Sequence, residues 1–409
     1  MRILWVTGSL PYPPATGGKI RVWNLLQQVT QFHDVTLLSL LDSPDEIQFL
    51  PRLRPYCTIH TVVKQRQRPR GKLFFRLLLT MLKGQPPRNC IAYYDGLKDK
   101  IYELTSRQSF DIVHVEQSQI APYIEFVSSA TKPARLITLY DVGAAQHERI
   151  IRIQTGLASA RVLTWLDWFF LRHWESTYLA RRFDRCIVVS SVDQALLSQA
   201  NPQLKLVVVP NGVDTVQYQR LPRLEDSKEI LFIGKMNYPP NVDGVLFFYH
   251  EIFPLVRRRV PEARMLIVGA EPSAEVQRLR NDPTVRMIGQ VEDVVPYYQR
   301  AYLSAVTLRA GGGTRLKILE AMALGRPVVS TTLGCEGLEV SPGENILAAD
   351  TPQGLAAHII RLFNDKGAYD RLVVNGRRLV ESRYDWRVTA QSLLQVYDIV
   401  GAAEKRVQK

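Results

Sequence analysis

Short apolar runs alternate with longer amphipathic segments along the first half of the chain. Each run ends in polar or turn residues, which is typical of strands buried in a parallel sheet. Patterns of helical period lie between the runs, for example over residues 20–31 and 163–182. This alternation predicts a doubly wound α/β domain. The predicted strands are Ile3–Thr7, Val35–Leu40, Thr58–Val63, Asp111–Val115, Arg135–Leu139, Arg185–Val189 and Lys205–Val209.

The pattern breaks near Asn211 and begins again at Ile230, after a charged stretch. We therefore predict an N-terminal domain of residues 1–210 and a second α/β domain of residues 211–385, with the helix in 386–409 crossing back to the first domain. Two such domains in series predict a ligand in an interdomain cleft, at the carboxyl ends of the strands. The later strands are expected over residues 230–233, 265–268, 285–288, 304–308 and 327–330, and the last helices over 352–364, 368–382 and 386–400.

The segment from Arg309 to Ser330 carries the most information about chemistry. It predicts a strand end, the three glycines 311–313, a helix, a glycine stop and another strand. Glycines directly before a helix let backbone N–H groups approach a phosphate at the positive end of the helix dipole. Arg315 and Lys317 add cations in the first turn, and Glu320 lies one turn further on the same face, where it suits sugar hydroxyls. A tight chain reversal alone would also explain the glycines.

Composition narrows the class of protein. The 409 residues are 46% hydrophobic and 22% charged, as in ordinary globular proteins. The four cysteines form no CxxC pair, so neither a zinc site nor a disulfide framework is indicated, and we expect no metal. The apolar stretches 73–82 and 162–171 are too short to span a bilayer, and the N-terminus does not resemble a signal peptide. We therefore expect a cytoplasmic location, with a peripheral position on the inner face of the cytoplasmic membrane left open.

Much of the net charge of +13 is concentrated in one stretch. Between Glu46 and Asp95 there is no acidic residue, and ten cations are interleaved with an apolar, Phe-containing segment. Residues 64–88 are typical of an interfacial helix on anionic lipid. The alternative is a helix that packs on its own domain with a solvated basic flank. Nucleic acid could use the same charge, but no nucleic-acid module is recognised, so we do not expect it as a partner.

A series of motifs makes a family resemblance specific from about residue 180 onward. The motifs are Asn211-Gly212-Val213-Asp214, Ile233-Gly234-Lys235, Leu266-Ile267-Val268-Gly269, Ile288-Gly289-Gln290-Val291-Glu292-Asp293, Leu319-Glu320-Ala321-Met322-Ala323 and Gly325-Arg326-Pro327-Val328-Val329. In their order and spacing they resemble the group 1 family of retaining glycosyltransferases, and within it the bacterial sugar transferases of exopolysaccharide systems of the PEP-CTERM/EpsH type. The resemblance implies the GT-B fold, in which two Rossmann-like domains face each other.

The resemblance implies a donor site for a nucleotide sugar in the second domain. Glu320 matches the glutamate that holds the ribose, whereas Gly312 stands where relatives carry a first glutamate that positions the sugar. Lys235 matches a basic residue that neutralises the departing diphosphate, although a solvated loop lysine would look the same. The usual second lysine is missing after it, and Arg315 or Lys317 could supply that charge. The remaining implied donor contacts are Gly312, Gly313, Thr314, Arg315, Leu316, Gln290 and Val291.

The first domain is expected to hold the acceptor side and part of the donor. Gly17 and Gly18 open the first helix, where the family approaches the donor phosphate or the acceptor, although a glycine hinge would also explain them. His114 and Asp141 follow predicted strands, so we expect them to line the acceptor side. Asp141 is a candidate acceptor contact or base, and His114 is either catalytic or a satisfied structural histidine. The turn after the first strand lacks the GxGxxG pattern, which argues against a dinucleotide oxidoreductase.

These features predict a hexosyltransferase-type glycosyltransferase that moves a sugar from a nucleoside diphosphate to an acceptor hydroxyl, in cell-surface polysaccharide or glycolipid synthesis. The acceptor is unidentified, and a lipid-linked molecule is one candidate. Lys235, Arg315, Asp141 and His114 are the proposed catalytic residues, and no cofactor is needed when cations stabilise the leaving diphosphate. The alternatives are a GT-B sugar-nucleotide epimerase and a non-enzymatic lipid- or nucleic-acid-binding protein on the same fold.

Overall fold

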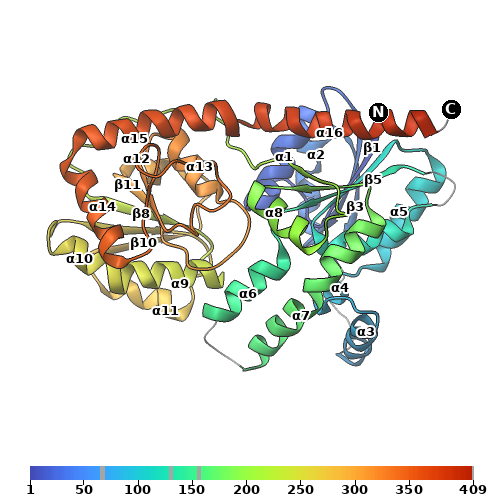
Figure 1. Cartoon of the computed structure of the whole chain (residues 1–409), viewed down its shortest axis with the longest axis horizontal. Coiled ribbons are helices and arrows are strands. Elements are labelled where there is room, and N and C mark those ends of the chain that lie inside the picture. Colours follow the sequence, from blue (N-terminus) through green and yellow to red (C-terminus); the bar gives the residue numbers. More distant parts are fainter. Residues whose placement is uncertain (65–69, 129–131, 154–157, 408–409) are drawn as a thin grey trace. The chain divides into compact units, whose positions relative to one another are not determined.

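The computed structural model describes residues 1–64, 70–128, 132–153 and 158–407. Their contacts divide the chain into two compact units (Figure 1). The N-terminal unit comprises Met1–Glu148, Gly156–Pro210 and Thr389–Lys409, and the C-terminal unit comprises Arg149–Thr155 and Asn211–Val388. The last helix, α16 (Trp386–Val407), begins in the C-terminal unit and continues in the N-terminal one.

The N-terminal unit is built on a parallel sheet of seven strands in the order β3-β2-β1-β4-β5-β6-β7. Strand β1, third in this order, pairs with β2 on one side and β4 on the other, so that Ile3 faces both Val35 and Ile112. Helices lie on both faces, which is why Ile3–Val6 of β1 are fully buried. The strands are β1 (Arg2–Thr7), β2 (Asp34–Leu41), β3 (Thr58–Val63), β4 (Ile112–Glu116), β5 (Ala134–Leu139), β6 (Arg185–Val188) and β7 (Leu206–Val208).

The helices of this unit vary widely in length, and α7 is the longest of those described. They are α1 (Gly17–Val29), α2 (Leu50–Leu53), α3 (Arg70–Leu82), α4 (Pro87–Ile91), α5 (Asp95–Arg107), α6 (Gly143–Ile153), α7 (Ala158–Arg182) and α8 (Ser191–Ala200), with 3-10 turns over Pro44–Phe49 and Ser118–Phe126. Helices α3 and α7 both pack on the short helix α4.

The C-terminal unit repeats this architecture with a six-stranded parallel sheet in the order β10-β9-β8-β11-β12-β13. The strands are β8 (Glu229–Ile233), β9 (Arg264–Val268), β10 (Val285–Gly289), β11 (Leu303–Val306), β12 (Val328–Ser330) and β13 (Leu347–Ala348). Strand β13 was not predicted because two residues are too few to leave a pattern. The helices are α9 (Pro239–Phe247), α10 (Phe253–Arg257), α11 (Ala274–Gln277), α12 (Val295–Arg300), α13 (Leu316–Ala323), α14 (Pro352–Asn364) and α15 (Lys366–Leu379).

The predicted fold class is confirmed, because each unit is an α/β domain on a parallel sheet. The strand order also locates the place where each sheet can bind a ligand. In both, the chain winds outward from a central strand and then restarts on its other side, so that the order reverses between β1 and β4 and between β8 and β11. Ligands of doubly wound sheets bind beyond the carboxyl ends of strands at such a reversal. No helix in the described residues is both long enough and apolar enough to cross a membrane.

Candidate functional site

The triple glycine lies at the reversal point of the C-terminal sheet, in the loop from β11 to α13. Gly311 and Gly313 have φ of 113° and 67°, which a residue with a Cβ atom rarely adopts. Helix α13 then starts at Leu316. Among the described residues no side chain caps this start, and its first turn carries no acid. Such a helix start suits an anion, and the predicted phosphate contact stays a prediction.

Arg315 braces this loop. Its guanidinium donates to the carbonyl oxygen of Gly312 at 2.6 Å and to that of Gly313, and the side chain is almost fully buried. These bonds hold the glycine turn in shape. The catalytic role expected for Arg315 stays a prediction. Thr314 is fixed separately, since Asn211 donates to its hydroxyl at 2.8 Å.

Lys317 is the cation that the fold aims at the reversal point. Its ammonium donates to Asn241 Oδ1 at 3.1 Å and lies 5.2 Å from the centre of the Phe232 ring. Asn241 belongs to the first turn of α9, and its Nδ2 donates to the Lys235 carbonyl at 3.0 Å. The loop after β8 and the helix after β11 are thus joined through one amide side chain.

The environment of Lys317 disfavours its charge when no anion is bound. Burial lowers the pKa of the ammonium from its ordinary 10.5 to about 7, and the neighbouring Arg315 acts in the same direction, whereas Glu320 opposes both. An anionic ligand beside Lys317 would restore the proton, because an opposite charge favours the ammonium.

Glu320 is half-buried one turn along α13. The hydroxyl of the buried Tyr298 donates to the Lys317 carbonyl at 3.0 Å and lies 3.5 Å from Glu320 Oε2. Burial raises the pKa of the Glu320 carboxyl to about 7, against the smaller, opposite effects of Lys317 and Tyr298. A half-buried carboxylate held in this way can accept hydrogen bonds from hydroxyl groups of a ligand.

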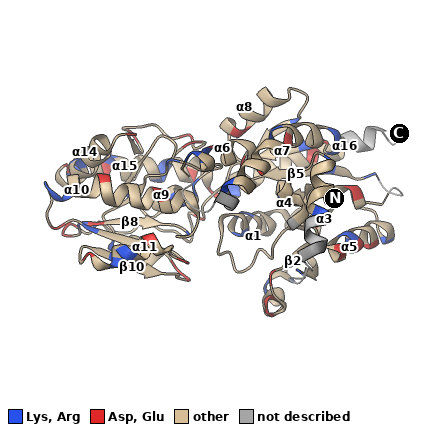
Figure 2. Cartoon of the chain, turned by 90° about the horizontal axis from the view of Figure 1, so that it is seen from below, with Lys and Arg blue, Asp and Glu red and all other residues tan. Residues whose placement is uncertain are grey.

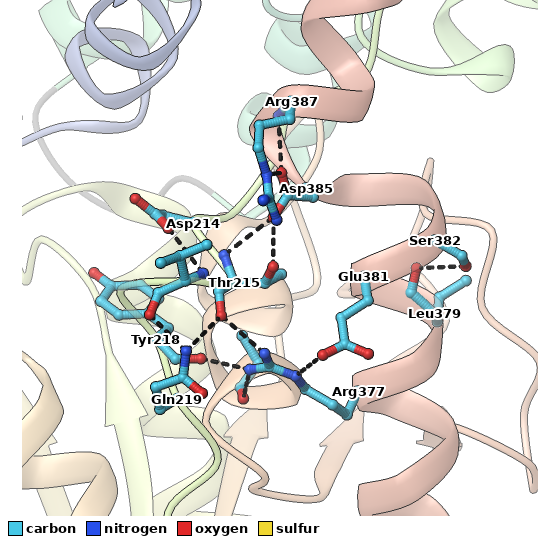
Figure 3. Close-up of polar contacts among 12 residues, drawn as sticks. Asp214, Thr215, Tyr218, Gln219, Arg377, Leu379, Glu381, Ser382, Asp385 and Arg387 are labelled. Carbon is cyan, nitrogen blue, oxygen red and sulfur yellow. Dashed lines mark hydrogen bonds and ion pairs between the residues drawn. The ribbon is translucent and has the colours of Figure 1, made fainter.

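Tyr218 lies near this carboxylate and was not foreseen from the sequence. Burial raises the pKa of the Tyr218 hydroxyl most, and the negative charges of Glu320 and Asp293 raise it further. Its backbone is held by Arg377 of α15, which donates to the carbonyls of Tyr218, Thr215 and Ala323 (Figure 3). Since Ala323 ends α13, one guanidinium ties the turn that carries Tyr218 to the helix that carries Glu320.

The same turn is anchored from the start of the last helix. Asp385 accepts a hydrogen bond from the Thr215 hydroxyl, and Arg387 pairs with that carboxylate at 2.7 Å (Figure 3). This network lies away from the glycine loop in sequence, yet it fixes the position of Tyr218. The network supports the site without forming part of it, so no sequence motif for ligand binding includes these residues.

Lys235 follows β8 at the reversal point, as predicted. Its side chain is half exposed and forms an ion pair of 3.3 Å with Glu271, a residue that also accepts from Asn237. The close packing of these loops needs glycine, because a Cβ at Gly269 would lie 1.7 Å from the Gly234 carbonyl oxygen. Lys235 is therefore near the proposed ligand but less firmly held than Lys317.

Gln290 and Val291 follow the edge strand β10, after Gly289 with φ of 97°. Gln290 is exposed, and Val291 packs against the hydrophobic core. Only backbone contacts to a ligand are plausible for Val291 in this position, and the role of this loop stays a prediction.

In the N-terminal unit, Gly17 and Gly18 start α1 at the reversal between β1 and β4, with no side-chain cap from Thr16. A Cβ on Gly18 would lie 2.6 Å from the Tyr140 ring, so packing alone requires glycine there. The glycine is thus explained without a ligand, and a donor or acceptor contact by these amides stays a prediction.

His114 does not face a ligand, which corrects the expectation of a catalytic role. The ring is fully buried, with Nδ1 2.7 Å from the Tyr397 hydroxyl and Nε2 2.7 Å from the Thr138 hydroxyl. Burial, together with the charge of Arg21, lowers its pKa to about 3, so the ring is neutral at physiological pH. His114 anchors α16 to the sheet, because its side chain points into the core from β4.

Asp141 stands just beyond β5 and is half-buried. It accepts a hydrogen bond of 2.6 Å from Gln146 of α6. The start of α6 is itself occupied, because Glu175 of α7 accepts from the amides of Gly143 and Ala144 at 3.2 Å each. The role of Asp141 as an acceptor contact or base stays a prediction. The nearby start of α6 already has Glu175 as its hydrogen-bond acceptor.

The structure thus brings together the glycine turn, Lys317, Glu320 and the loop of Lys235, and it adds Asn241, Tyr298 and Tyr218. Asn241 lies 76 positions before Lys317, so only the fold reveals this pair. The arrangement combines a cation and a helix N-terminus, which suit a phosphate, with a carboxylate that suits hydroxyl groups.

Part of the chain is similar to known glycosyltransferases. Residues 227–365, which contain most of these groups, match the model of the family described as Glycosyl transferases group 1. The phosphatidyl-myo-inositol mannosyltransferase of Mycobacterium tuberculosis is 29% identical over 216 residues, which cover 49% of this chain and 56% of that protein. The match thus spans about half the length of this curated relative.

Solved structures resemble the chain over nearly its whole length. Sucrose-phosphate synthase from Thermosynechococcus elongatus has a TM-score of 0.69 at 20% identity, with 98% of this chain and 100% of that chain covered. HepE of Anabaena, solved with UDP and glucose, has a TM-score of 0.68 at 15% identity, with 97% and 99% covered. At these identities the likeness establishes the GT-B fold alone. The match to the family model is confined to residues 227–365, in the C-terminal unit.

Proposed function

We propose that this protein is a glycosyltransferase that moves a sugar from a nucleoside diphosphate to an acceptor hydroxyl, with retention of the anomeric configuration. The observation that carries the proposal is the Lys317 ammonium, held by Asn241 beside the uncapped start of α13. Lys317 is half-buried, and the charge of Glu320 only partly offsets the effects of burial and of Arg315 on its ammonium. A further anion beside it would favour the ammonium, and a diphosphate is the anion that this setting fits.

The chemistry follows from the distribution of charge. When the bond from the anomeric carbon to the phosphate oxygen breaks, negative charge builds up on the diphosphate. Lys317, the α13 amides and Lys235 stabilise that charge in a partly dry site, where such interactions are strongest. The new bond forms between the anomeric carbon and the acceptor oxygen. The acceptor proton passes to the leaving phosphate oxygen, so no separate base is required, and Asp141 would then orient the acceptor.

Glu320 would hold the ribose hydroxyls, with Tyr298 fixing the carboxylate and Tyr218 lining the same region. Gly312 offers no side chain where relatives carry a glutamate, so the donor sugar would be gripped by the loop amides and Thr314. A uridine nucleotide is the first candidate donor, because the structural neighbour HepE was solved with UDP and glucose.

A lipid-linked acceptor is the acceptor class we favour, in cell-surface glycolipid or polysaccharide synthesis. It is supported by the name of the mannosyltransferase relative, which acts on phosphatidyl-myo-inositol, and by the basic stretch 64–88, of which residues 65–69 lie outside the described residues. The protein would then work at the inner face of the cytoplasmic membrane, on an anionic surface.

The test starts with a thermal-shift screen against UDP, GDP and their sugars, since a ligand that binds only the folded state raises the melting temperature. The donor that binds is then incubated with membrane lipid extracts, and the glycosylated product is analysed for its anomeric configuration by NMR. Isomerisation of the donor without any acceptor would indicate the epimerase instead. Binding of no nucleotide at all would contradict both enzymatic functions.

A further inference from the structure

Helix α7 carries an exposed aromatic face that the family resemblance does not explain. Trp165 and Phe169 stack on each other at 5.7 Å, yet they are 49% and 53% exposed. Val162 and Arg172 extend the same face at helical spacing, and both are exposed. Large apolar side chains at this spacing are normally buried against a core, so this stripe lacks the cover that its pattern calls for.

Helix α3 presents a second stripe of the same kind. Phe75, Leu78, Leu79 and Leu82 follow each other at i, i+3, i+4 and i+7, and all four are exposed, with Leu82 at 74%. This spacing places the four exposed side chains on one face of α3, while the helix itself packs on α4. The alternative interpretation, a helix packed on its own domain with a solvated basic flank, therefore stays open.

The two stripes belong to one region of the N-terminal unit. Both helices pack on α4, and Figure 1 shows them at the same end of that unit. Asp167 on the inner side of α7 accepts from the Arg88 backbone at 3.0 Å, which fixes α7 on α4. Each stripe is thus presented by a helix that is anchored on its opposite side.

The charge around the stripes selects the partner. Helix α3 contains no acidic residue (Figure 2), and exposed Lys83 directly follows its stripe. Arg161 and Arg172 flank the aromatic stripe on α7 and are exposed. Within this region Asp95 pairs with Arg76 of α3 at 3.5 Å. Apolar stripes bordered by cations suit a lipid bilayer, which has an apolar interior and, when its headgroups are anionic, a negative surface.

We propose that the exposed faces of α3 and of the first half of α7 together form a docking surface for an anionic lipid bilayer, with Trp165 and Phe169 entering the boundary between headgroups and acyl chains. Tryptophan favours this boundary because its ring is apolar while its N–H can stay hydrated. The inference rests on the proposed membrane association and adds to it a second helix, which lies outside the basic stretch 64–88.

The experiment is co-sedimentation of the full chain with vesicles of phosphatidylcholine alone or with added phosphatidylglycerol. Wild type is expected to pellet with the anionic vesicles and to be released by high salt. Trp165→Ser with Phe169→Ser should lower the partition coefficient at least about tenfold, since withdrawing one large apolar side chain already corresponds to such a factor. Phe32→Ser is the matched control, because Phe32 is 66% exposed but lies at the end of α1.

Two further readouts keep the outcomes apart. Brominated acyl chains should quench wild-type tryptophan fluorescence, and Trp165→Phe should lose much of that quenching while it still pellets.

Unchanged pelleting of the double variant would overturn the role of α7 but leave membrane association standing, whereas wild type that never pellets would end both. A dimer that the double variant cannot form would show that a second copy covers the stripe instead, which also overturns the proposal. Nucleotide binding should be equal in all variants, which separates a docking defect from misfolding.

Discussion

Both units carry ionisable groups near the point where the strand order of the sheet reverses, but the groups are buried in one unit and accessible in the other. In the N-terminal unit, His114 lies on the strand beside the reversal, and its ring is closed off between Tyr397 and Thr138. In the C-terminal unit, Lys317 and Glu320 follow the reversal and remain half-buried at its edge. Both environments shift pKa values through burial, but only the second leaves the groups within reach of a ligand.

The difference teaches that a perturbed pKa next to a strand end does not define a functional group. His114 projects from within β4 and so meets the helix that covers the sheet. Lys317 and Glu320 project from the first turns of the helix that follows the strand, where the chain has already passed the sheet edge. Groups on the element that follows a strand are therefore better candidates for ligand contacts than groups within the strand. Variants at both kinds of position test that distinction.

Removal of the Lys317 ammonium should have the largest effect. Lys317→Met is expected to lower kcat about 10²- to 10³-fold, because one preorganised charge at a developing anion contributes on that scale. Steady-state kinetics with the donor found by thermal shift provides the measurement. Lys366→Met is the control, since it removes an exposed lysine that pairs with Glu225 in the same unit. Similar losses in both variants would contradict the role of Lys317.

Glu320→Ala should act mainly on donor binding. Loss of charge-assisted hydrogen bonds to the ribose is expected to raise the dissociation constant of the nucleotide about 10- to 100-fold, which corresponds to roughly 1.5–3 kcal/mol. Calorimetric titration measures it directly. A deoxyribose donor analogue should bind the variant and the wild type more equally. If the variant discriminates between ribose and deoxyribose as the wild type does, the carboxylate does not contact the ribose.

Lys235→Ala should have a smaller effect than Lys317→Met. The side chain is half exposed and shares Glu271, so solvent and salt weaken its field, and we expect roughly a tenfold loss in kcat/KM. The loss should shrink as ionic strength rises. A loss larger than that of Lys317→Met would mean that the two lysines have been assigned in the wrong order.

His114→Phe should change activity least. The substitution leaves the Tyr397 and Thr138 hydroxyls without their partner, so unfolding should become easier by about 1–3 kcal/mol. Below the melting temperature, kcat should stay within about twofold of wild type, because the ring does not reach a ligand. A native melting temperature with a large fall in kcat would restore the catalytic interpretation of His114.

Much of the fold could be predicted from the sequence because buried parallel strands leave continuous apolar runs. Strand β13 escaped because it has only two residues. The glycine turn, Lys235 and Glu320 were found from local pattern and resemblance. The bond between Asn241 and Lys317 was not, since a contact between residues so far apart in sequence leaves no local signal.

The misassignment of His114 has a physical cause. A sequence shows that His114 stands near a strand end, but not that its side chain turns into the core. The exposed stripe of α7 was missed for a similar reason, because its apolar spacing is the same as that of a helix buried in a core.

The central claim is that Lys317 contacts the diphosphate, and proton uptake on binding tests it most directly. With the pKa of the free ammonium at about 7, most Lys317 side chains are neutral at pH 8, and a bound diphosphate would restore the proton. Titration of UDP-glucose or GDP-mannose, whichever binds, in two pH 8 buffers of different ionisation enthalpy measures this uptake. We predict the uptake of nearly one proton by wild type and of almost none by Lys317→Arg, because arginine stays protonated. Equal uptake by both proteins, or binding without uptake by wild type, would contradict the account.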